Sequence, residues 1–233
     1  FDRNPILGNA NEAGLTPSLY GNTHRFLLVG SKKFDYGTGK IWSTTVSFFS
    51  NWTSGNRFAY VYGGDINNDG TGSNDIMYVP TDVEIDLMSF APLLDINGNI
   101  QNATAQRNAL KAFIAQDEYL SSRRGRYTEK YGGQTPWFGQ LDIRILQDLR
   151  FKNSKRNQSL QFSVDMQNIG TLISSEWGVR QLATTSGYFQ PLSVSLTGSS
   201  PTYQFDPSQT KTFTASPDLF SRWQIQLGLR YIF

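Results

Sequence analysis

The sequence predicts an all-β protein, and within that class a transmembrane antiparallel β-barrel, from three observations. Long segments alternate apolar and polar residues with a period of two, which puts the apolar side chains on one face of a strand. The clearer strands run for about 10–12 residues, long enough to cross a bilayer at a tilt and longer than the usual 5–6. Short and long connections alternate strictly along the chain, as they do in outer-membrane barrels.

The composition excludes several classes of protein. The 233 residues include no cysteine and a single histidine, and the net charge is +2. Without cysteine there is no disulfide framework and no thiolate metal site, and His24 alone provides neither a catalytic triad nor a zinc site. No apolar run approaches the roughly 18 residues of a membrane helix, and no basic tract points to nucleic acid. We therefore expect neither an enzyme nor a nucleic-acid-binding protein.

The strands are clearest toward the end of the chain. In 222–233 the odd positions are Trp, Ile, Leu, Leu, Tyr and Phe, and most even positions are polar or glycine. The segments 141–151 and 160–167 alternate in the same way. Upstream, 41–62 favours either one long strand or two short ones, and 24–36 favours a strand whose faces are blurred by four apolar residues in a row.

The two faces of these strands predict two environments. The polar faces mix Asp and Arg with Gln, as a wet lumen requires, and the residues expected to line it are Asp142, Arg144, Asp148, Asp165 and Arg230. We expect the three aspartates to pair across strands with Arg144, Arg150 and Arg230. Aromatic residues near the strand ends are expected to face lipid at the membrane interfaces, and these are Trp42, Trp223, Tyr231 and Phe233.

The connections predict an orientation. The turns 37–40 and 152–157 are short and are expected on the periplasmic side, whereas 1–22, 63–136 and 171–218 are expected to be extracellular loops. Five strands are too few to close a barrel, which needs at least about eight. The whole chain, 1–233, is therefore expected to be the C-terminal portion of one β-barrel domain. The remaining strands would come from upstream sequence or, as an alternative, from other chains.

The long connections carry elements of their own. The segment 102–120 predicts a helix packed on the first long loop, with an apolar stripe that includes Leu110 and Phe113. The basic segment 121–126 favours a solvated loop or a contact with lipopolysaccharide, with an acidic ligand as the alternative. Alternation at Leu192, Val194 and Leu196 indicates further strands within 187–213.

One loop carries a metal-binding pattern. Asp65, Asn67, Asp69 and Gly70 match the first half of a calcium loop, in which alternating oxygen ligands converge on one cation. The glutamate usual at position twelve is missing, although Asp75 precedes that position. The hypothesis is a Ca²⁺ site made by Asp65, Asn67, Asp69 and Asp75, and the alternative is a turn rich in Asn, Asp and Gly.

Several motifs together resemble TonB-dependent outer-membrane receptors of Bacteroidetes, in the SusC-like and Oar-like branches. They are Asp65-Ile-Asn-Asn-Asp-Gly, Asn74-Asp-Ile-Met-Tyr-Val-Pro, Pro136-Trp, Asp165-Met-Gln-Asn-Ile-Gly, Trp177-Gly and the last strand, 222–233. The resemblance implies a 22-stranded barrel with an N-terminal plug and a TonB box, of which this chain supplies the last five or so strands. It implies location in the bacterial outer membrane, contact with its lipid, coupling to TonB through the missing N-terminal part, and a surface lipoprotein lid. It also implies that the barrel-assembly machinery reads the terminal Phe233.

Three functions follow as hypotheses. The first is TonB-dependent active transport of a large solute, such as an oligosaccharide or a peptide. The second is a structural or passive barrel subunit of a larger outer-membrane assembly. The third is a soluble Ca²⁺-dependent carbohydrate-binding β module, which requires the aromatic strand faces to pack as a core.

Overall fold

The computed structural model describes residues 4–8, 14–21, 23–153, 156–184, 186–198 and 200–233. Strands hold 43% of the chain, against about 20–25% in an average globular protein, which confirms the predicted all-β class. No helix among the described residues has the length and apolar character needed to span a membrane.

The chain divides into two compact units, which we describe separately. The sheet unit consists of Asn22–Gly55, Pro136–Gln181 and Ala215–Phe233. The core unit consists of Phe1–Gly21, Asn56–Thr135 and Leu182–Thr214. The core unit's segments follow closely the ranges predicted as long loops, 1–22, 63–136 and 171–218.

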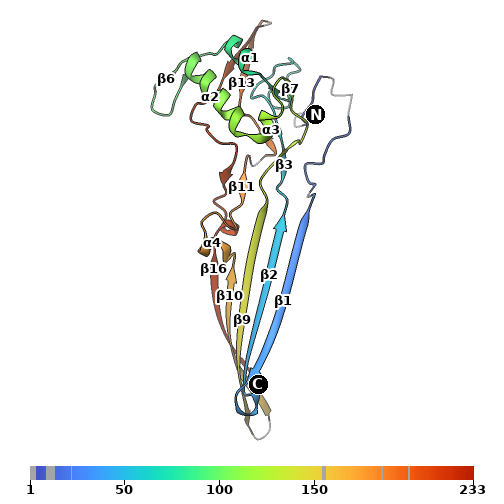
Figure 1. Ribbon diagram of the computed structural model, residues 1–233, viewed down its shortest axis with the longest axis vertical. Helices are drawn as coiled ribbons and strands as arrows, with labels where there is room; N and C mark the ends of the chain where they lie inside the picture. The colour runs from blue at the N-terminus through green and yellow to red at the C-terminus, as the bar shows by residue number, and fades with distance from the viewer. Residues whose placement is uncertain (1–3, 9–13, 22, 154–155, 185, 199) are drawn as a thin grey trace. The chain divides into compact units, whose positions relative to one another are not determined.

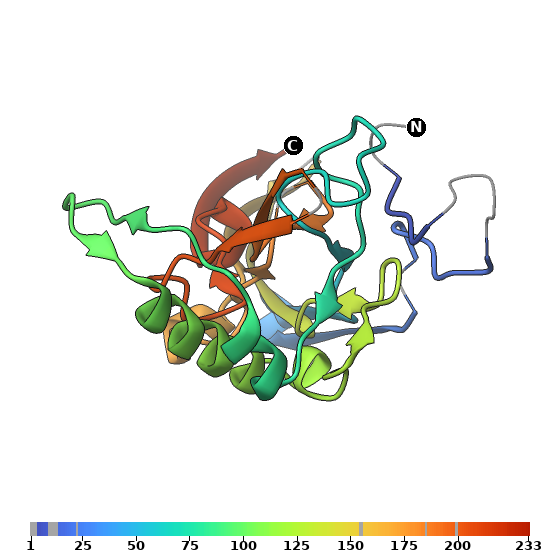
Figure 2. The same ribbon diagram turned by 90° about the horizontal axis from the view of Figure 1, so that it is seen from above.

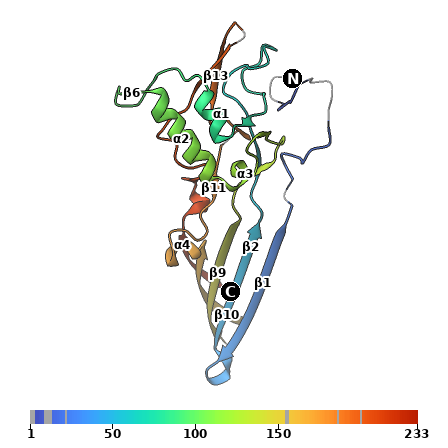
Figure 3. The same ribbon diagram turned by 45° about the horizontal axis from the view of Figure 1, so that its top comes forward.

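The sheet unit is built on five antiparallel strands that lie side by side (Figure 1). Their order is β1 (Arg25–Tyr36), β2 (Trp42–Thr53), β9 (Phe138–Asn153), β10 (Arg156–Gln167) and β16 (Gln224–Ile232). Figure 3 shows β1, β2, β9 and β10 from a second direction. The sheet is open, with β1 and β16 at its edges.

All five predicted strands are confirmed, with changed ends. The segment 41–62 forms two strands, because Ser54 and Gly55 interrupt it after β2, and β3 (Arg57–Tyr60) belongs to the core unit. The predicted turn 152–157 is shorter than expected, since β9 runs to Asn153 and β10 begins at Arg156; positions 154–155 lie outside the described residues. The other short turn contains η1 (Thr38–Lys40), and α4 (Gly170–Ile173) and η2 (Leu219–Ser221) flank the last connection.

The described residues of the core unit form short strands and three helices. The helices are α1 (Asp82–Leu87), α2 (Ala103–Gln116) and α3 (Glu118–Ser121). Besides β3, the strands are β4 (Tyr78–Val79), β5 (Leu93–Leu94), β6 (Ile100–Gln101), β7 (Arg126–Tyr127), β8 (Gly133–Gln134), β12 (Tyr188–Phe189), β13 (Ser193–Thr197) and β14 (Ser200–Gln204). β13 and β14 confirm the strands expected within 187–213. β11 (Gln181–Leu182) and β15 (Thr214–Ala215) form a further two-stranded sheet.

Side chains fix where these helices begin. Thr81 and Glu84 form a capping box at α1, and Asn102 accepts a hydrogen bond from the Ala105 N–H at the start of α2. The predicted helix 102–120 is broken at Asp117, whose backbone is extended and whose carboxylate accepts from the Leu120 N–H at 2.9 Å. One predicted helix is therefore two.

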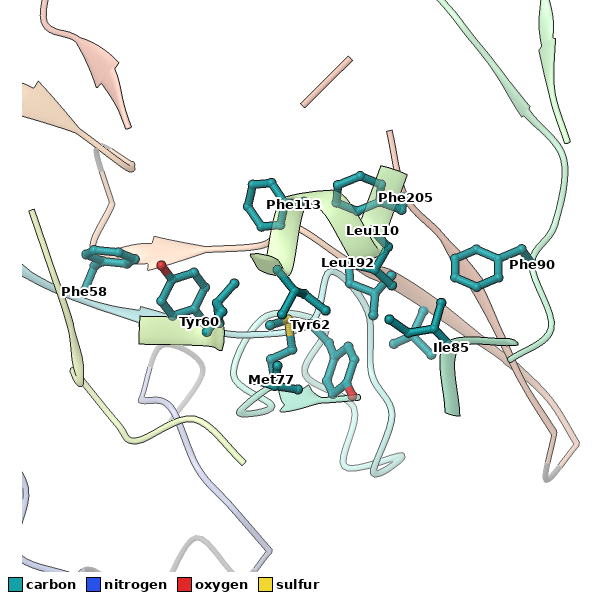
Figure 4. Close-up of a cluster of buried hydrophobic side chains, with 14 residues drawn as sticks. Phe58, Tyr60, Tyr62, Met77, Ile85, Phe90, Leu110, Phe113, Leu192 and Phe205 are labelled. Atoms are coloured by element: carbon teal, nitrogen blue, oxygen red, sulfur yellow. The ribbon is translucent and has the colours of Figure 1, made fainter. Parts of the chain in front are cut away.

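A hydrophobic cluster fills the core unit (Figure 4). It joins Tyr60 and Phe58 of β3 with Leu110 and Phe113 of α2, and Leu192 and Phe205 from the last part of the chain complete it. Most of these side chains are almost fully buried. The apolar stripe predicted on the helix thus packs inward, and burial of this cluster is what holds the short strands together.

Candidate functional site

One face of the five-stranded sheet is apolar and exposed. The register puts Tyr36, Trp42, Leu149, Leu160 and Tyr231 in one row across the five strands. Rows nearer the middle are largely aliphatic, and they include Val46, Ile145, Val164 and Leu227. Leu227 and Leu229 are 65% and 71% exposed. An exposed apolar surface of this extent marks a contact with something other than water.

Aromatic side chains gather at both ends of this sheet. At the end with the short turns, Tyr231 stacks between Phe151 and Phe233, with ring centroids 6.3 and 5.7 Å away. At the other end, Trp137 stacks on Phe26 at 6.0 Å. Of the four aromatic residues predicted to face lipid, Trp42, Tyr231 and Phe233 lie at the short-turn end and Trp223 at the far end. All four are exposed.

A few polar groups interrupt the apolar face. Gln147 breaks the apolar pattern of β9, and its Oε1 accepts hydrogen bonds from the hydroxyls of Thr44 (2.6 Å) and Tyr36 (3.1 Å). Lys32 lies on the same face of the edge strand β1, opposite Val46. Gln147 therefore has partners within the sheet, and Lys32 is an exposed charge on this face.

The opposite face carries the residues predicted to line a lumen. Arg144 and Asp165 are cross-strand partners and form an ion pair of 3.0 Å, which confirms one predicted pair. Arg230 lies in the row of Asp148 and Gln161, on the same face. This face carries mixed charges and amides, with Val29 and Phe49 among its apolar exceptions, while the first face carries mainly rings and aliphatic chains.

The other predicted charge pairs on this face are wrong. Arg150 of β9 pairs with Asp35 of β1 at 3.0 Å, across the strand β2 that lies between them. Asp148 accepts a hydrogen bond from Gln161 at 2.8 Å. Asp142 accepts from the backbone N–H of Asn168 at 2.8 Å, at the far end of the sheet. The sequence predicted the residue types but not the partner of each charged side chain.

Asn168 ties three segments together where β10 ends. Its φ is +49°, a left-handed conformation that asparagine tolerates better than most residues. Its Nδ2 donates to the carbonyls of Gly178 at 2.8 Å and Phe220 at 2.9 Å. The motifs around Asn168 and Gly178 were noted in the sequence only for their resemblance to a family, and the structure brings them into contact.

The proposed calcium loop is closed by its own hydrogen bonds. Asp65 accepts from the backbone N–H groups of Asp69 (3.1 Å) and Gly70 (2.7 Å), and Asn67 accepts from Asp69 at 2.9 Å. Asp75 accepts from the Ile66 N–H at 2.9 Å. Among the residues that the structure describes, no group of three or more His, Cys, Asp or Glu side chains is arranged to hold a metal ion. The Ca²⁺ site stays a prediction.

Two carboxyls of this loop have shifted pKa values. Burial raises the pKa of Asp75, and the charges of Asp69 and Asp65 act in the same direction against hydrogen bonds from the backbone. Burial also opposes ionisation of Asp69, but hydrogen bonds from Thr71, Asn74 and Asn67 outweigh it and hold the pKa of Asp69 below its usual range. The pKa values of Asp75 and Asp69 are therefore shifted in opposite directions, although both residues belong to the same proposed calcium-binding pattern.

The basic segment 121–126 contributes to the core unit. Arg123 pairs with Glu129 and lies over the Tyr119 ring at 5.2 Å. Arg124 pairs with Asp82 of α1 at 2.6 Å and donates to a backbone carbonyl of α2. Two of the three arginines are therefore engaged within the unit.

Sequence reasoning missed a buried carboxylate. Asp117 is 5% exposed and accepts hydrogen bonds from the Tyr60 hydroxyl at 2.6 Å and from Thr212. Burial, followed by the charge of Asp117, raises the pKa of Tyr60 far above its usual value. The two hydrogen-bond partners of Asp117 lie 57 and 95 positions away in the sequence, so no local sequence pattern could indicate them.

Comparisons with protein-family models, curated proteins and solved structures gave no match.

Proposed function

We propose that the five-stranded sheet is part of the wall of an outer-membrane β-barrel, and that this barrel is a TonB-dependent transporter of a large solute such as an oligosaccharide or a peptide. The observation that carries the membrane step is the exposed apolar face. In a soluble protein, such a face would need a covering layer. Lipid covers it in a barrel, and the polar face with Arg144, Asp165 and Arg230 then lines a wet lumen.

The spacing of the aromatic residues supports this proposal. Trp42 and Trp52 stand at the two ends of β2. At about 3.3 Å per residue their ten-residue separation is roughly 33 Å along the strand. A tilt of about 45° reduces this to roughly 23 Å, which is close to the apolar band of about 25 Å between aromatic girdles. Lys32 lies within this band, and a lysine there keeps its ammonium near the interface by extending its stem.

The open edges of the sheet support closure by further strands. Unpaired backbone groups in lipid cost several kcal/mol each, so β1 and β16 require partners there. The proposal places these strands, the plug and the TonB box elsewhere in the same protein, with the barrel-assembly machinery binding at Phe233 and a lipoprotein lid over the loops. These parts rest on the family resemblance.

The soluble-module hypothesis makes a different demand on the same residues. It requires the aromatic strand faces to pack as a core. The core of this chain instead lies around Tyr60 and Phe113, in the other unit, while Leu227 is 65% exposed. This distribution favours the lipid-facing proposal.

Cysteine labelling tests the membrane step, and none of these 233 residues is a cysteine that would compete for the label. Leu227→Cys and Gln226→Cys place a nitroxide on opposite faces at the middle of β16, in the native protein in washed membranes. We expect the label at 227 to be relaxed mainly by oxygen, which concentrates in lipid, and the label at 226 mainly by a water-soluble nickel complex. Equal relaxation of both labels by the nickel complex would contradict a lipid-facing sheet.

Energy dependence tests the transport step. The measurement is the accumulation of a pool of labelled peptides and oligosaccharides by cells that carry the gene and by cells that lack it. Each strain is tested with and without a proton ionophore. Active transport predicts a subset of solutes whose accumulation falls both on deletion and with the ionophore. Accumulation that falls on deletion alone identifies the passive barrel instead.

A further inference from the structure

The core unit contains a pocket that the transport proposal does not use. It has a volume of about 400 Å³ and lies between the β5–β6 hairpin and the segments that flank β13 and β14. Figure 2 shows the hairpin projecting from the start of α2. The volume is within the range of small-molecule sites, about 300–1,000 Å³. The pocket lies entirely within one unit, so its lining does not depend on the placement of the sheet.

The lining is negatively charged. Asp95 and Asp206 are its ionisable side chains, and none of the described residues that line it carries a positive charge. Hydrogen bonds from the Asn99 side chain and backbone hold the pKa of Asp95 below its usual range. Asp95 therefore stays ionised and also closes its own hairpin. Such a pocket repels anions and attracts cations.

The polar groups are fixed so that acceptors remain. Gln190 donates its Nε2 to the Tyr62 carbonyl at 3.2 Å, and Gln204 donates its Nε2 to the Pro92 carbonyl at 2.9 Å. Each bond uses one of the two N–H groups of the amide and fixes its orientation, and the Oε1 atom of each glutamine is left as an acceptor. Asp206 accepts the Ser208 N–H through Oδ1, which leaves Oδ2 as a third acceptor. These groups suit a ligand that donates several hydrogen bonds.

The apolar part of the lining narrows the ligand further. Leu93, Ile96 and Pro191 contribute aliphatic surface, and the described lining residues include no aromatic ring on which a sugar would stack. Guanidinium and ammonium groups on aliphatic stems match both the acceptors and this surface. We propose that the pocket binds the cationic side chain of an arginine- or lysine-containing peptide, with Asp206 as the charged partner.

The proposed binding of a cationic side chain is tested by fluorescence anisotropy. The probe is labelled leucyl-arginine amide, and the protein is the native protein in detergent. The matched probe is leucyl-citrulline amide, a neutral analogue of the same shape. We expect the citrulline probe to bind at least about tenfold more weakly, since a charge-assisted hydrogen bond contributes on the order of one factor of ten. This comparison needs no variant. Equal affinity for the two probes would overturn the proposal.

Two variants locate the site. Asp206→Asn removes the charge but keeps Oδ1 as acceptor for Ser208, and we expect roughly tenfold weaker binding. Glu118→Gln removes the same charge from an exposed position outside the pocket and should change binding by less than about twofold. Equal affinities of the two variants overturn the assignment to this pocket. Displacement of the probe by maltotriose at comparable concentration would show a polyol site instead. Both results are independent of transport and membrane insertion.

Discussion

Trp52 lies over Gly139 of the neighbouring strand, so that a Cβ added at Gly139 would stand 2.5 Å from the indole ring. The ring takes the place of a side chain at that position, and its Nε1 donates to the Ser50 hydroxyl at 2.9 Å. This aromatic residue marks the far end of the sheet's apolar face, and its position depends on a neighbour without a side chain.

Gly139→Ala is expected to displace the Trp52 ring. Overpacking of this kind costs about 1–3 kcal/mol. The measurement is urea-induced unfolding in detergent, followed by tryptophan fluorescence. Gly14→Ala is the control, because a Cβ there meets no atom within 4 Å. Equal stability of the two variants would show that the indole does not pack on this glycine.

Gly178→Ala is expected to disrupt the Asn168 connection. A Cβ at Gly178 would lie 1.9 Å from Asn168 Oδ1, and φ is +64°. Gly39→Ala is a matched control, since φ is +70° there but the space is open. Positive φ alone costs about 1–2 kcal/mol. We expect the Gly178 variant to lose at least about 1 kcal/mol more than the control in unfolding experiments, since the clash adds to that penalty. Equal losses would contradict the contact.

Tyr60 is expected to make the core unit sensitive to alkali. Its pKa is raised by burial and by Asp117, so the folded state favours the neutral phenol. A group whose pKa is higher in the folded state stabilises that state fully at pH values below its unfolded pKa, which is about 10 for tyrosine. The stabilisation is lost as the pH rises from the unfolded pKa toward the folded pKa. Unfolding free energy should therefore fall between about pH 10 and 11.5, and fall less in Tyr60→Phe. Parallel curves for both proteins would refute this role.

A charge on the apolar face is expected to cost more than one on the polar face. Leu227→Arg should lower stability in lipid vesicles by about 2–4 kcal/mol, because it places a cation near the bilayer midplane. Gln226→Arg, on the neighbouring residue, should change it by less than about 1 kcal/mol. Urea titration of protein folded into vesicles measures both. Similar losses at the two positions would argue against one lipid-facing and one wet face.

Limited proteolysis distinguishes the two hypotheses for the loop 65–75. If Asp65, Asn67, Asp69 and Asp75 bind Ca²⁺, we expect slower cleavage of this loop in about 1 mM CaCl₂ than in the presence of a chelator. Millimolar Ca²⁺ occupies weak extracellular sites, whose Kd values are about 10⁻⁴–10⁻³ M. The slowing should disappear in Asp69→Ala. The turn hypothesis predicts equal cleavage rates with and without the ion.

The sheet was predictable because its two faces carry different kinds of side chain. Each strand then repeats apolar and polar residues with a period of two, as from Trp223 to Phe233, and the period survives without knowledge of the partners. The pairing of Arg150 with Asp35 was not predictable, since the two residues are 115 positions apart and their side chains meet across the intervening strand β2.

The core unit was less predictable for a related reason. Its strands are mostly two residues long, so they have no period, and they are held by contacts between distant segments. The helix 102–120 was found through its apolar stripe. Its break at Asp117 was missed, because that residue acts through Tyr60 and Thr212 and through the cap of α3.

Migration of the native protein on gels, before and after boiling, tests the central claim most directly, together with its intact mass. A closed barrel stays folded in detergent, so we expect faster migration before boiling and a mass several times the 26.2 kDa of this chain. A 26.2 kDa species that remains soluble without detergent and migrates alike before and after boiling would contradict the membrane proposal.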